Sequence, residues 1–493
     1  MPFRSAVLVV ALLLAAAVPA ADASKRPTEP GTGAYGLPNY QVAEEPPHCS
    51  EDVCVHWVAT TADAPADLSD DDADGVPDAI ELLRFGLQRA HDHMTETLGW
   101  REPVSDGTLG GGDGLSDTYV KRLNGNAAGV AIRDEGADFY RPAGFVVVDS
   151  VFLAPANLGF AQRKLAPHEL QHLIEFAYDG YFEGWHGEAT AEWAAAQSDG
   201  SYALLGGYPE AWARTTEYPL LGVRDPETGA PPGKGYAAVI WQRWLTDRYG
   251  PELIRALWEH ADTVNPHSFV PSSVETALEG RSGFIEEFVT FAVRHAEWRL
   301  PPAGLGWGSG VPDVERVAQL VPGGEARTAT LDHTTFALMD VPVSATATSY
   351  ELRASAPAGT RSAFALVGRR GDATGGTTET VVQHAPSGGD VVLGLRDPAQ
   401  FERITAVLVN SDVSIAAPSR DEWWDWIYAR DAQALTARIV PTDRPPPPVD
   451  PIDSPLPPPP EPERPLPPPP PPVPEDLAPP SLRLGDLPRG ALR

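Results

Sequence analysis

Lysine is scarce in this chain, and the shortage of positive charge narrows the classes of partner. Lysine occurs only at positions 25, 121, 164 and 234 among 493 residues, and the formal net charge is −31. Binding to nucleic acid or to an anionic membrane surface requires clustered lysine and arginine. The composition therefore argues against both of these partners, and it suits the binding of cations.

Long apolar runs are also missing. Near the N-terminus, residues 6–18 (AVLVVALLLAAAV) follow Arg4, but this run is shorter than the roughly 20 residues that a membrane-spanning helix needs. A charged start, a short apolar run and small residues before Ala20 and Ala23 are typical of a secretory signal peptide. We expect residues 1–23 to be removed and the mature protein to be secreted, without a membrane span.

Cysteine is nearly absent, because the chain contains only Cys49 and Cys54. In an oxidising compartment such a close pair predicts a disulfide. The alternative is that one thiolate caps a metal ion and keeps an enzyme inactive. The presence of a second cysteine nearby favours the disulfide.

Composition divides the chain into six segments. In order, we expect a signal peptide at 1–23, an N-terminal arm at 24–47, an α+β domain at 48–300, a linker at 301–324, an all-β sandwich-type domain at 325–440 and a Pro-rich tail at 441–493. Short apolar blocks separated by Gly, Pro, Asp and Asn indicate the β domain. The arm and the tail are rich in proline and polar residues, so we expect both to be disordered.

Apolar spacing predicts individual elements within the two domains. Ile80, Leu83, Leu87, Met94 and Leu98 keep a helical spacing. Further helices are expected at 237–257, interrupted by Gly250 and Pro251, and at 284–300. The expected strands are 130–134, 144–150, 349–355, 363–368, 379–385, 390–396 and 404–410.

Residues 168–172 read His-Glu-Leu-Gln-His, a pattern with a specific chemical use. On a helix, His168 and His172 lie one turn apart on the same face, so both imidazoles can bind one metal ion. Glu169 lies beside them and can polarise a water on that ion. The alternative to a metal site is a core helix on which both histidines only form hydrogen bonds. A third metal ligand elsewhere in the sequence would argue against this alternative.

A third ligand is expected downstream of this helix. A metzincin would have glycine at position 175 and histidine at position 178, but this chain has Glu175 and Tyr178, which excludes that class. Residues 185–193 read WHGEATAEW, in which Glu188 and Glu192 are one helical turn apart. The pattern Trp-x-x-Glu-Ala-x-Ala-Glu-Trp resembles the gluzincin metallopeptidases.

The resemblance implies a zincin-like catalytic domain with a zinc site. Its ligands in this chain would be His168, His172 and Glu188. In that family the second acid, here Glu192, supports a zinc-bound histidine from outside the ligand set. Glu169 would assist the attack of a zinc-activated water on a peptide bond. Spacing alone leaves Glu192 open as the third ligand, and His186 is a weaker option.

The chain is also similar to a group of uncharacterised secreted bacterial proteins regarded as metalloproteases. The shared features are an Asp-rich loop ending in GVPD at 70–78, a GGDGxxD stretch at 111–117, the histidine helix at 168–172 and the glutamate helix at 188–192. This second resemblance implies the same class of enzyme. It adds little about the substrate.

Residues 70–81 read DDDADGVPDAIE and match a twelve-residue calcium loop. The expected ligands are Asp70, Asp72, Asp74, the carbonyl of Val76, Asp78 and Glu81. Gly75 stands where the loop turns sharply, whereas Pro77 replaces the usual aliphatic residue and no helix is expected before the loop. We therefore expect a half-motif that binds structural Ca²⁺, with a solvated acidic turn as the alternative. Asp113 and Asp117 are weaker candidates for a second site.

These patterns together predict a secreted, monomeric zinc endopeptidase that acts on extracellular proteins or peptides and carries structural calcium. One alternative is a non-catalytic, calcium-stabilised surface or adhesion protein that retains a zincin-like fold. Another is a hydrolase of a non-protein amide. Loss of Glu169 would have favoured the non-catalytic alternative. Tyr236, Tyr218 and His260 are candidates for stabilising the oxyanion, and the sequence favours none of them.

Overall fold

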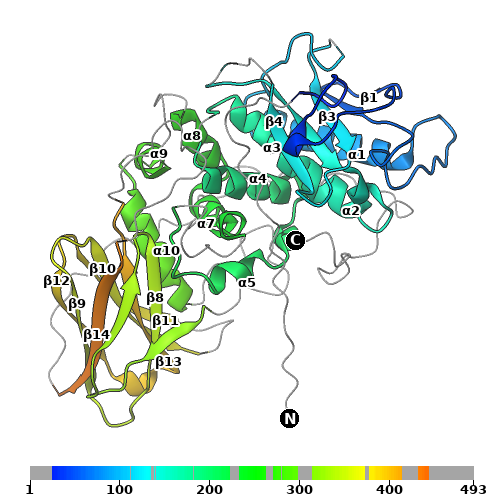
Figure 1. The fold of residues 1–493 in the computed structure, drawn as a ribbon. Helices are drawn as coiled ribbons and strands as arrows, with labels where there is room; N and C mark the ends of the chain where they lie inside the picture. The colour runs from blue at the N-terminus through cyan, green and yellow to red at the C-terminus, as the bar shows by residue number, and fades with distance from the viewer. Residues whose placement is uncertain are drawn as a thin grey trace, which may run out of the picture.

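The computed structural model describes residues 25–443 except 112, 135–137, 139, 181, 222–232, 262–269, 279, 298–313, 372–376 and 414–430. The signal peptide expected at 1–23 and nearly all of the tail expected at 441–493 lie outside the described residues. A region of helices and a mixed sheet precedes a β-rich region (Figure 1). Within the described ranges, no helix is long and apolar enough to cross a membrane.

A five-stranded mixed sheet organises the N-terminal region. In spatial order its strands are β1 (His48–Cys49), β2 (Val53–His56), β3 (Ser116–Lys121), β5 (Gly144–Asp149) and β4 (Gly129–Arg133). β2, β3 and β5 are parallel, and β4 pairs antiparallel with β5. β4 and β5 coincide with the strands expected at 130–134 and 144–150, and β4 forms one edge of the sheet.

Two helices, α1 (Asp78–Asp92) and α3 (Ala166–Phe176), contribute with Val146 and Val148 of β5 to one apolar core on one face of the sheet. α1 carries the expected helical spacing and continues into a wider turn at His93–Thr97. A similar wide turn, Ala161–Leu165, precedes α3. Pro167 stands in the first turn of α3, where the N–H that proline lacks would have no partner within the helix.

The N-terminal arm covers the other face of the sheet and is ordered from residue 25, so the expectation of a disordered arm is wrong. The guanidinium of Arg26 is buried and forms ion pairs with Asp106, Asp117 and Asp134. Ala34 of the arm packs in a separate apolar cluster with Tyr119, Leu123, Phe145 and Val147. Composition could not reveal this, because the ion-pair partners of Arg26 and the apolar partners of Ala34 are distant in the sequence.

Helices dominate the chain after α3. They are α4 (Gly184–Asp199), α5 (Tyr208–Ala213), α6 (Lys234–Ala237), α7 (Val239–Tyr249), α8 (Glu252–Ala261), α9 (Val270–Ala277) and α10 (Phe284–Glu297). α7 and α8 are separated at Gly250 and Pro251, as expected. α4 is buried along nearly its whole length, and it lies beside α3. This close packing is possible because small residues such as Ala189 face the neighbouring helices.

Two sheets share one apolar core in the β-rich region. Their spatial orders are β11-β10-β13-β8-β6 and β12-β9-β14-β7. The bounds are β6 (Arg316–Gln319), β7 (Arg327–Leu331), β8 (Thr335–Val341), β9 (Ser349–Ala356), β10 (Ser362–Arg370), β11 (Thr377–Ala385), β12 (Gly389–Arg396), β13 (Arg403–Asn410) and β14 (Gln433–Thr442). β6 falls within the segment expected to be a linker, 301–324. Each of the five strands expected in this region is present.

The helical and β-rich regions are packed directly against each other. α10 lies against the outer face of the sheet that contains β8, β10 and β13 (Figure 1). Side chains along β8 alternate, so that Phe336 and Leu338 join the helical core while Ala337 and Met339 join the core between the sheets. The rings of Phe288 and Phe336 are 6.4 Å apart.

Candidate metal centre

The three residues predicted as metal ligands meet between α3 and α4. His168 and His172 lie one turn apart on α3, and their ring centroids are 4.9 Å apart. Oε2 of Glu188, on α4, lies 3.2 Å from Nε2 of His168 and 3.7 Å from Nε2 of His172. All three side chains are buried, and their ligand atoms lie within 4.8 Å of one another.

The donor set fits a zinc ion. Oε2 of Glu188 is buried, which is costly for a carboxylate oxygen unless nearby positive charge compensates it. Two imidazole nitrogens and one carboxylate oxygen are ligands that Zn²⁺ takes in catalytic sites, where a fourth position is left for water. The convergence of these atoms is therefore the arrangement expected of a three-ligand zinc site.

A carboxylate lies near the second nitrogen of each histidine. Nδ1 of His168 lies 3.4 Å from Oε1 of Glu192, and Nδ1 of His172 lies 2.8 Å from Oε2 of Glu175. Such partners orient metal-binding histidines and select the tautomer that presents Nε2. The supporting position of Glu192 was predicted. The position of Glu175 behind His172 was not predicted. Its spacing of three residues from His172 on one helix could have indicated this contact.

Glu192 has further partners that hold it away from the Nε2 atoms. Nζ of Lys164 lies 3.1 Å from Oε2 of Glu192, and the hydroxyl of Tyr208 donates to Oε1 at 3.2 Å. Lys164 also lies over the ring of Tyr208. The structure thus places Glu188 beside both Nε2 atoms, and it places Glu192 behind His168.

His186, the third option considered for a ligand, has different neighbours. Its Nδ1 lies 2.9 Å from Nε2 of Gln242, and its ring stacks on Trp258. Burial lowers the pKa of His186 to about 3, so this side chain is neutral at physiological pH. It serves the packing of α4 against α7 and α8.

Glu169 lies against the edge strand of the sheet. A Cβ atom added at Gly129 of β4 would come within 2.8 Å of Oε1 and Cγ of Glu169. The absence of a side chain at Gly129 therefore makes room for this carboxylate. Burial raises the pKa of Glu169, while His168 and His172 oppose the rise. A carboxylate with a raised pKa is better suited to exchange protons near neutral pH.

The charges in the centre are strongly coupled. Burial opposes protonation of His168, but Glu188 and Glu192 outweigh it and raise its pKa to about 9. Burial also opposes ionisation of Glu188, but the two histidines outweigh it and lower its pKa to about 2. Buried glutamates thus surround the histidines with negative charge. A divalent cation offsets such a charge.

Of the three candidates for stabilising the oxyanion, Tyr236 contacts a predicted metal ligand. Its ring stacks on His168 with 5.9 Å between the centroids. Tyr218 lies in the loop after α5, where its N–H donates to the carbonyl of Thr215. His260 lies on α8, with Nε2 3.4 Å from the hydroxyl of Thr276 on α9.

The predicted calcium loop is folded around its acidic side chains. Oδ2 of Asp70 accepts from the N–H of Gly75 at 2.9 Å, and Oδ1 of Asp74 accepts from the N–H of Val76 at 2.8 Å. Gly75 has a φ of 96°, which glycine adopts without strain. Oxygens of Asp70, Asp72 and Asp74 lie within 4.8 Å of one another.

The remaining predicted calcium ligands lie at the start of the following helix. α1 begins at Asp78, and Oδ1 of Asp78 accepts from the N–H of Asp71 at 3.2 Å. Burial and the charges of Asp72, Asp74 and Asp78 raise the pKa of Glu81, so these carboxylates are close enough to repel one another. No helix precedes the loop in the described chain between β2 and α1, as the half-motif predicts.

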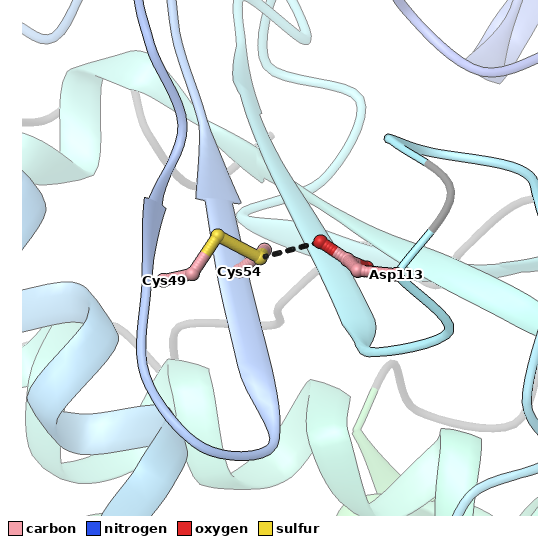
Figure 2. Close-up of side chains that lie close together, drawn as sticks. All are labelled: Cys49, Cys54 and Asp113. Atoms are coloured by element: carbon pink, nitrogen blue, oxygen red, sulfur yellow. Dashed lines mark hydrogen bonds between the residues drawn. A yellow bond between two sulfur atoms is a disulfide. The ribbon is translucent and has the colours of Figure 1, made fainter.

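Cys49 and Cys54 form the predicted disulfide between β1 and β2 (Figure 2). A thiolate that caps a metal ion is thereby excluded. Oδ2 of Asp113 lies 3.6 Å from Sγ of Cys54, but disulfide sulfurs are not the thiolates that bind metals. Asp117, the other weaker candidate for a second calcium site, is buried on β3 and ion-paired with Arg26.

Comparison with known proteins does not supply a family. No protein-family model matches the chain, and no curated protein matches it. Function must therefore be inferred from the geometry of the site itself.

Proposed function

We propose that this protein is a secreted zinc-dependent endopeptidase of the gluzincin type. The proposal is carried by the convergence of His168, His172 and Glu188 around one point, with Glu169 adjacent on the same helix. Glu175 and Glu192 lie behind the two histidines, as the supporting carboxylates of a zinc site do. When bound, zinc polarises a water molecule and the carbonyl group of a substrate.

In this proposal, Glu169 is the residue that moves protons. Its carboxylate takes a proton from the attacking water while the water oxygen bonds to the carbonyl carbon of the peptide. It then gives that proton to the leaving nitrogen as the C–N bond breaks. One water is consumed for each bond, and the products are a carboxylic acid and an amine.

The edge strand β4 supports a peptide as the substrate. β4 pairs with β5 on one side, and among the described strands it has no neighbour on the other. An extended peptide can add to such an edge through main-chain hydrogen bonds. Because Gly129 of this strand contacts Glu169, a peptide bound along β4 would pass beside the proposed base. This favours a peptide over a non-protein amide.

We also propose that the loop at 70–81 binds structural Ca²⁺. Its support is the clustering of Asp70, Asp72 and Asp74 immediately before α1. Extracellular calcium is abundant enough to occupy loops of modest affinity. The disulfide Cys49–Cys54 is compatible with export, because disulfides persist in oxidising compartments.

Zinc titration of the purified protein tests the ligand set. Metal-free wild type should bind one zinc ion per chain, and His172→Ala should lose this stoichiometric binding. His260→Ala is a matched control on α8 and should bind zinc as the wild type does. If His172→Ala still binds one zinc ion with unchanged affinity, the proposed ligand set is wrong. Metal binding without any hydrolysis would favour the non-catalytic surface protein.

A further inference from the structure

A second group of side chains that can bind a metal ion lies where the last turn of α1 meets the turn between β1 and β2. His91 and Asp92 end α1, and Asp52 immediately precedes β2. Nδ1 of His91 lies 3.3 Å from Oδ2 of Asp52 and 3.8 Å from Oδ1 of Asp92. One ligand atom from each residue lies within 4.8 Å of the other two. None of these residues belongs to the zinc centre or to the loop at 70–81.

The imidazole of His91 is buried and directs its Nδ1 into this group. Only 4% of the residue is exposed, and its Nε2 lies 2.5 Å from Oε2 of Glu102. A carboxylate at this position favours the tautomer with the proton on Nε2, as it does for metal-binding histidines. Nδ1 then presents a lone pair, and among the described residues it has no hydrogen-bond partner. A buried lone pair that faces two carboxylates is unfavourable unless a cation lies between the three groups.

Gln88 holds the two carboxylates in place beside His91. Its Nε2 donates to Oδ2 of Asp52 and to Oδ1 of Asp92, both at 2.6 Å. Its Oε1 accepts from Oγ of Ser50 at 2.6 Å and from the N–H of Asp52 at 3.2 Å, which fixes the orientation of the amide. Each carboxylate oxygen has a further lone pair, so it can accept from Gln88 and still bind a cation. The group is therefore arranged before an ion arrives.

The spacing and the type of the ligand atoms favour zinc. Ligand atoms at about 2.0–2.2 Å from a tetrahedral zinc ion lie roughly 3.3–3.6 Å from one another. The separation of 3.3 Å between His91 and Asp52 agrees with this range, and the separation of 3.8 Å from Asp92 requires only a small movement of a side chain. An imidazole ligand suits zinc, whereas calcium and magnesium prefer sites made of oxygen atoms.

We propose that Asp52, His91 and Asp92 bind a second zinc ion, which joins the turn before β2 to the end of α1. This inference goes beyond the proposed peptidase function and does not depend on it. The side chains of Asp52 and Asp92 are 34% and 48% exposed, so water competes for them more than it does in the buried centre. The second ion therefore binds more weakly than the first and occupies its site only when zinc is in excess. Because it binds the folded state, it stabilises the protein.

Calorimetric titration with zinc tests this site. Wild type that already holds one zinc ion per chain should show a second, weaker binding event, and its melting temperature should rise as this site fills. His91→Asn should abolish the second event over the same concentrations, because loss of a supporting partner alone costs about 10- to 100-fold in affinity. His93→Asn, two residues further along the chain and outside the group, is the matched control and should bind the second ion as the wild type does.

Two further variants keep the test decisive. Asp92→Asn changes a half-exposed side chain, so it should fold normally and still weaken the second event by about 10-fold or more. His172→Ala should lose the tight event and keep the weak one, so failure of the proposed function and failure of this inference are distinguishable.

Three results would overturn the second site. The first is a wild type that binds no zinc beyond one ion per chain. The second is an unchanged weak event in both His91→Asn and Asp92→Asn, because the ion would then bind elsewhere. The third is displacement of the second zinc by an equal concentration of calcium, because the imidazole would then not select the ion.

Discussion

Oε2 of Glu175 lies 2.8 Å from Nδ1 of His172, three residues earlier on the same helix. The contact determines which nitrogen of His172 faces the ligand pocket, because Nδ1 carries the proton shared with the carboxylate and Nε2 is directed to Glu188. Glu175 is completely buried, and burial raises its pKa to about 7 although His172 opposes the rise. In the proposed zinc site, this buried carboxylate would orient His172 as a metal ligand.

Replacement of Glu175 should weaken metal binding without removing a ligand. Glu175→Ala should lower zinc affinity by about 10- to 100-fold, because the ring of His172 loses its orienting partner. Competition with a chromophoric chelator measures this. Glu210→Ala, on the exposed surface of α5, is the control and should keep the wild-type affinity. Equal affinities in all three proteins would show that Glu175 does not support the site.

A single methyl group on β4 should disturb catalysis and leave metal binding intact. Gly129→Ala places a Cβ atom 2.8 Å from the Glu169 carboxylate, so the carboxylate must move. We expect activity to fall by about 10-fold or more, since small misplacements of catalytic groups are costly. Zinc content should stay at one per chain.

Gly207→Ala is the matched control for this change, because its Cβ would enter open space. It should retain full activity. A Gly129→Ala enzyme as active as Gly207→Ala would mean that Glu169 is not positioned by this strand.

Acid should destabilise the protein through a histidine outside the metal centre. His295 is buried on α10 and accepts a hydrogen bond from Nε1 of Trp212, and burial lowers its pKa to about 4. The folded-state pKa lies below that of the unfolded chain, so the unfolded state binds more protons between pH 4 and about 6.5. The free energy of unfolding should therefore fall as pH decreases through this window, by up to about 1.4 kcal/mol per pH unit.

Denaturant titrations at several pH values measure this effect. His295→Gln should be less stable than the wild type near pH 6.5, and the difference should narrow toward pH 4.5 because glutamine does not titrate there. If the free energy of unfolding falls with decreasing pH equally in both proteins, groups other than His295 cause the acid sensitivity.

Calcium should stabilise the wild type through the loop at 70–81. Binding to the folded state alone adds about 2.7 kcal/mol at a hundredfold excess over Kd. Millimolar calcium should thus raise the melting temperature and slow autolysis, and Asp72→Ala should abolish most of the gain. Asp71→Ala is the control, because Asp71 stands at a position of the loop that supplies no ligand. A melting curve indifferent to calcium after complete chelation would leave the loop as a solvated turn.

Local patterns were sufficient to predict most elements and the centre of the site. Helical spacing placed α1, and the four-residue spacing of His168 and His172 placed both imidazoles on one face of α3. These predictions succeed because helix geometry relates nearby residues directly. The position of Glu188 beside both histidines was predicted from a resemblance, since spacing alone could not separate it from Glu192.

Contacts between distant residues were not predictable in this way. The order of the arm depends on Arg26 meeting Asp106, Asp117 and Asp134, which lie at least 80 positions away along the chain. Proline and glycine in the arm suggested disorder, but the ion pairs of Arg26 and the packing of Ala34 against the sheet hold the arm in place.

The most direct test measures zinc content and casein hydrolysis side by side, in the wild type and in Glu169→Gln. The substitution keeps the size of the side chain and removes its ability to accept a proton. We predict one zinc ion per chain in both proteins, hydrolysis by the wild type, and a loss of turnover of roughly 10²-fold or more in Glu169→Gln. Equal hydrolysis by the two proteins, or a wild type that binds no zinc, would contradict the account.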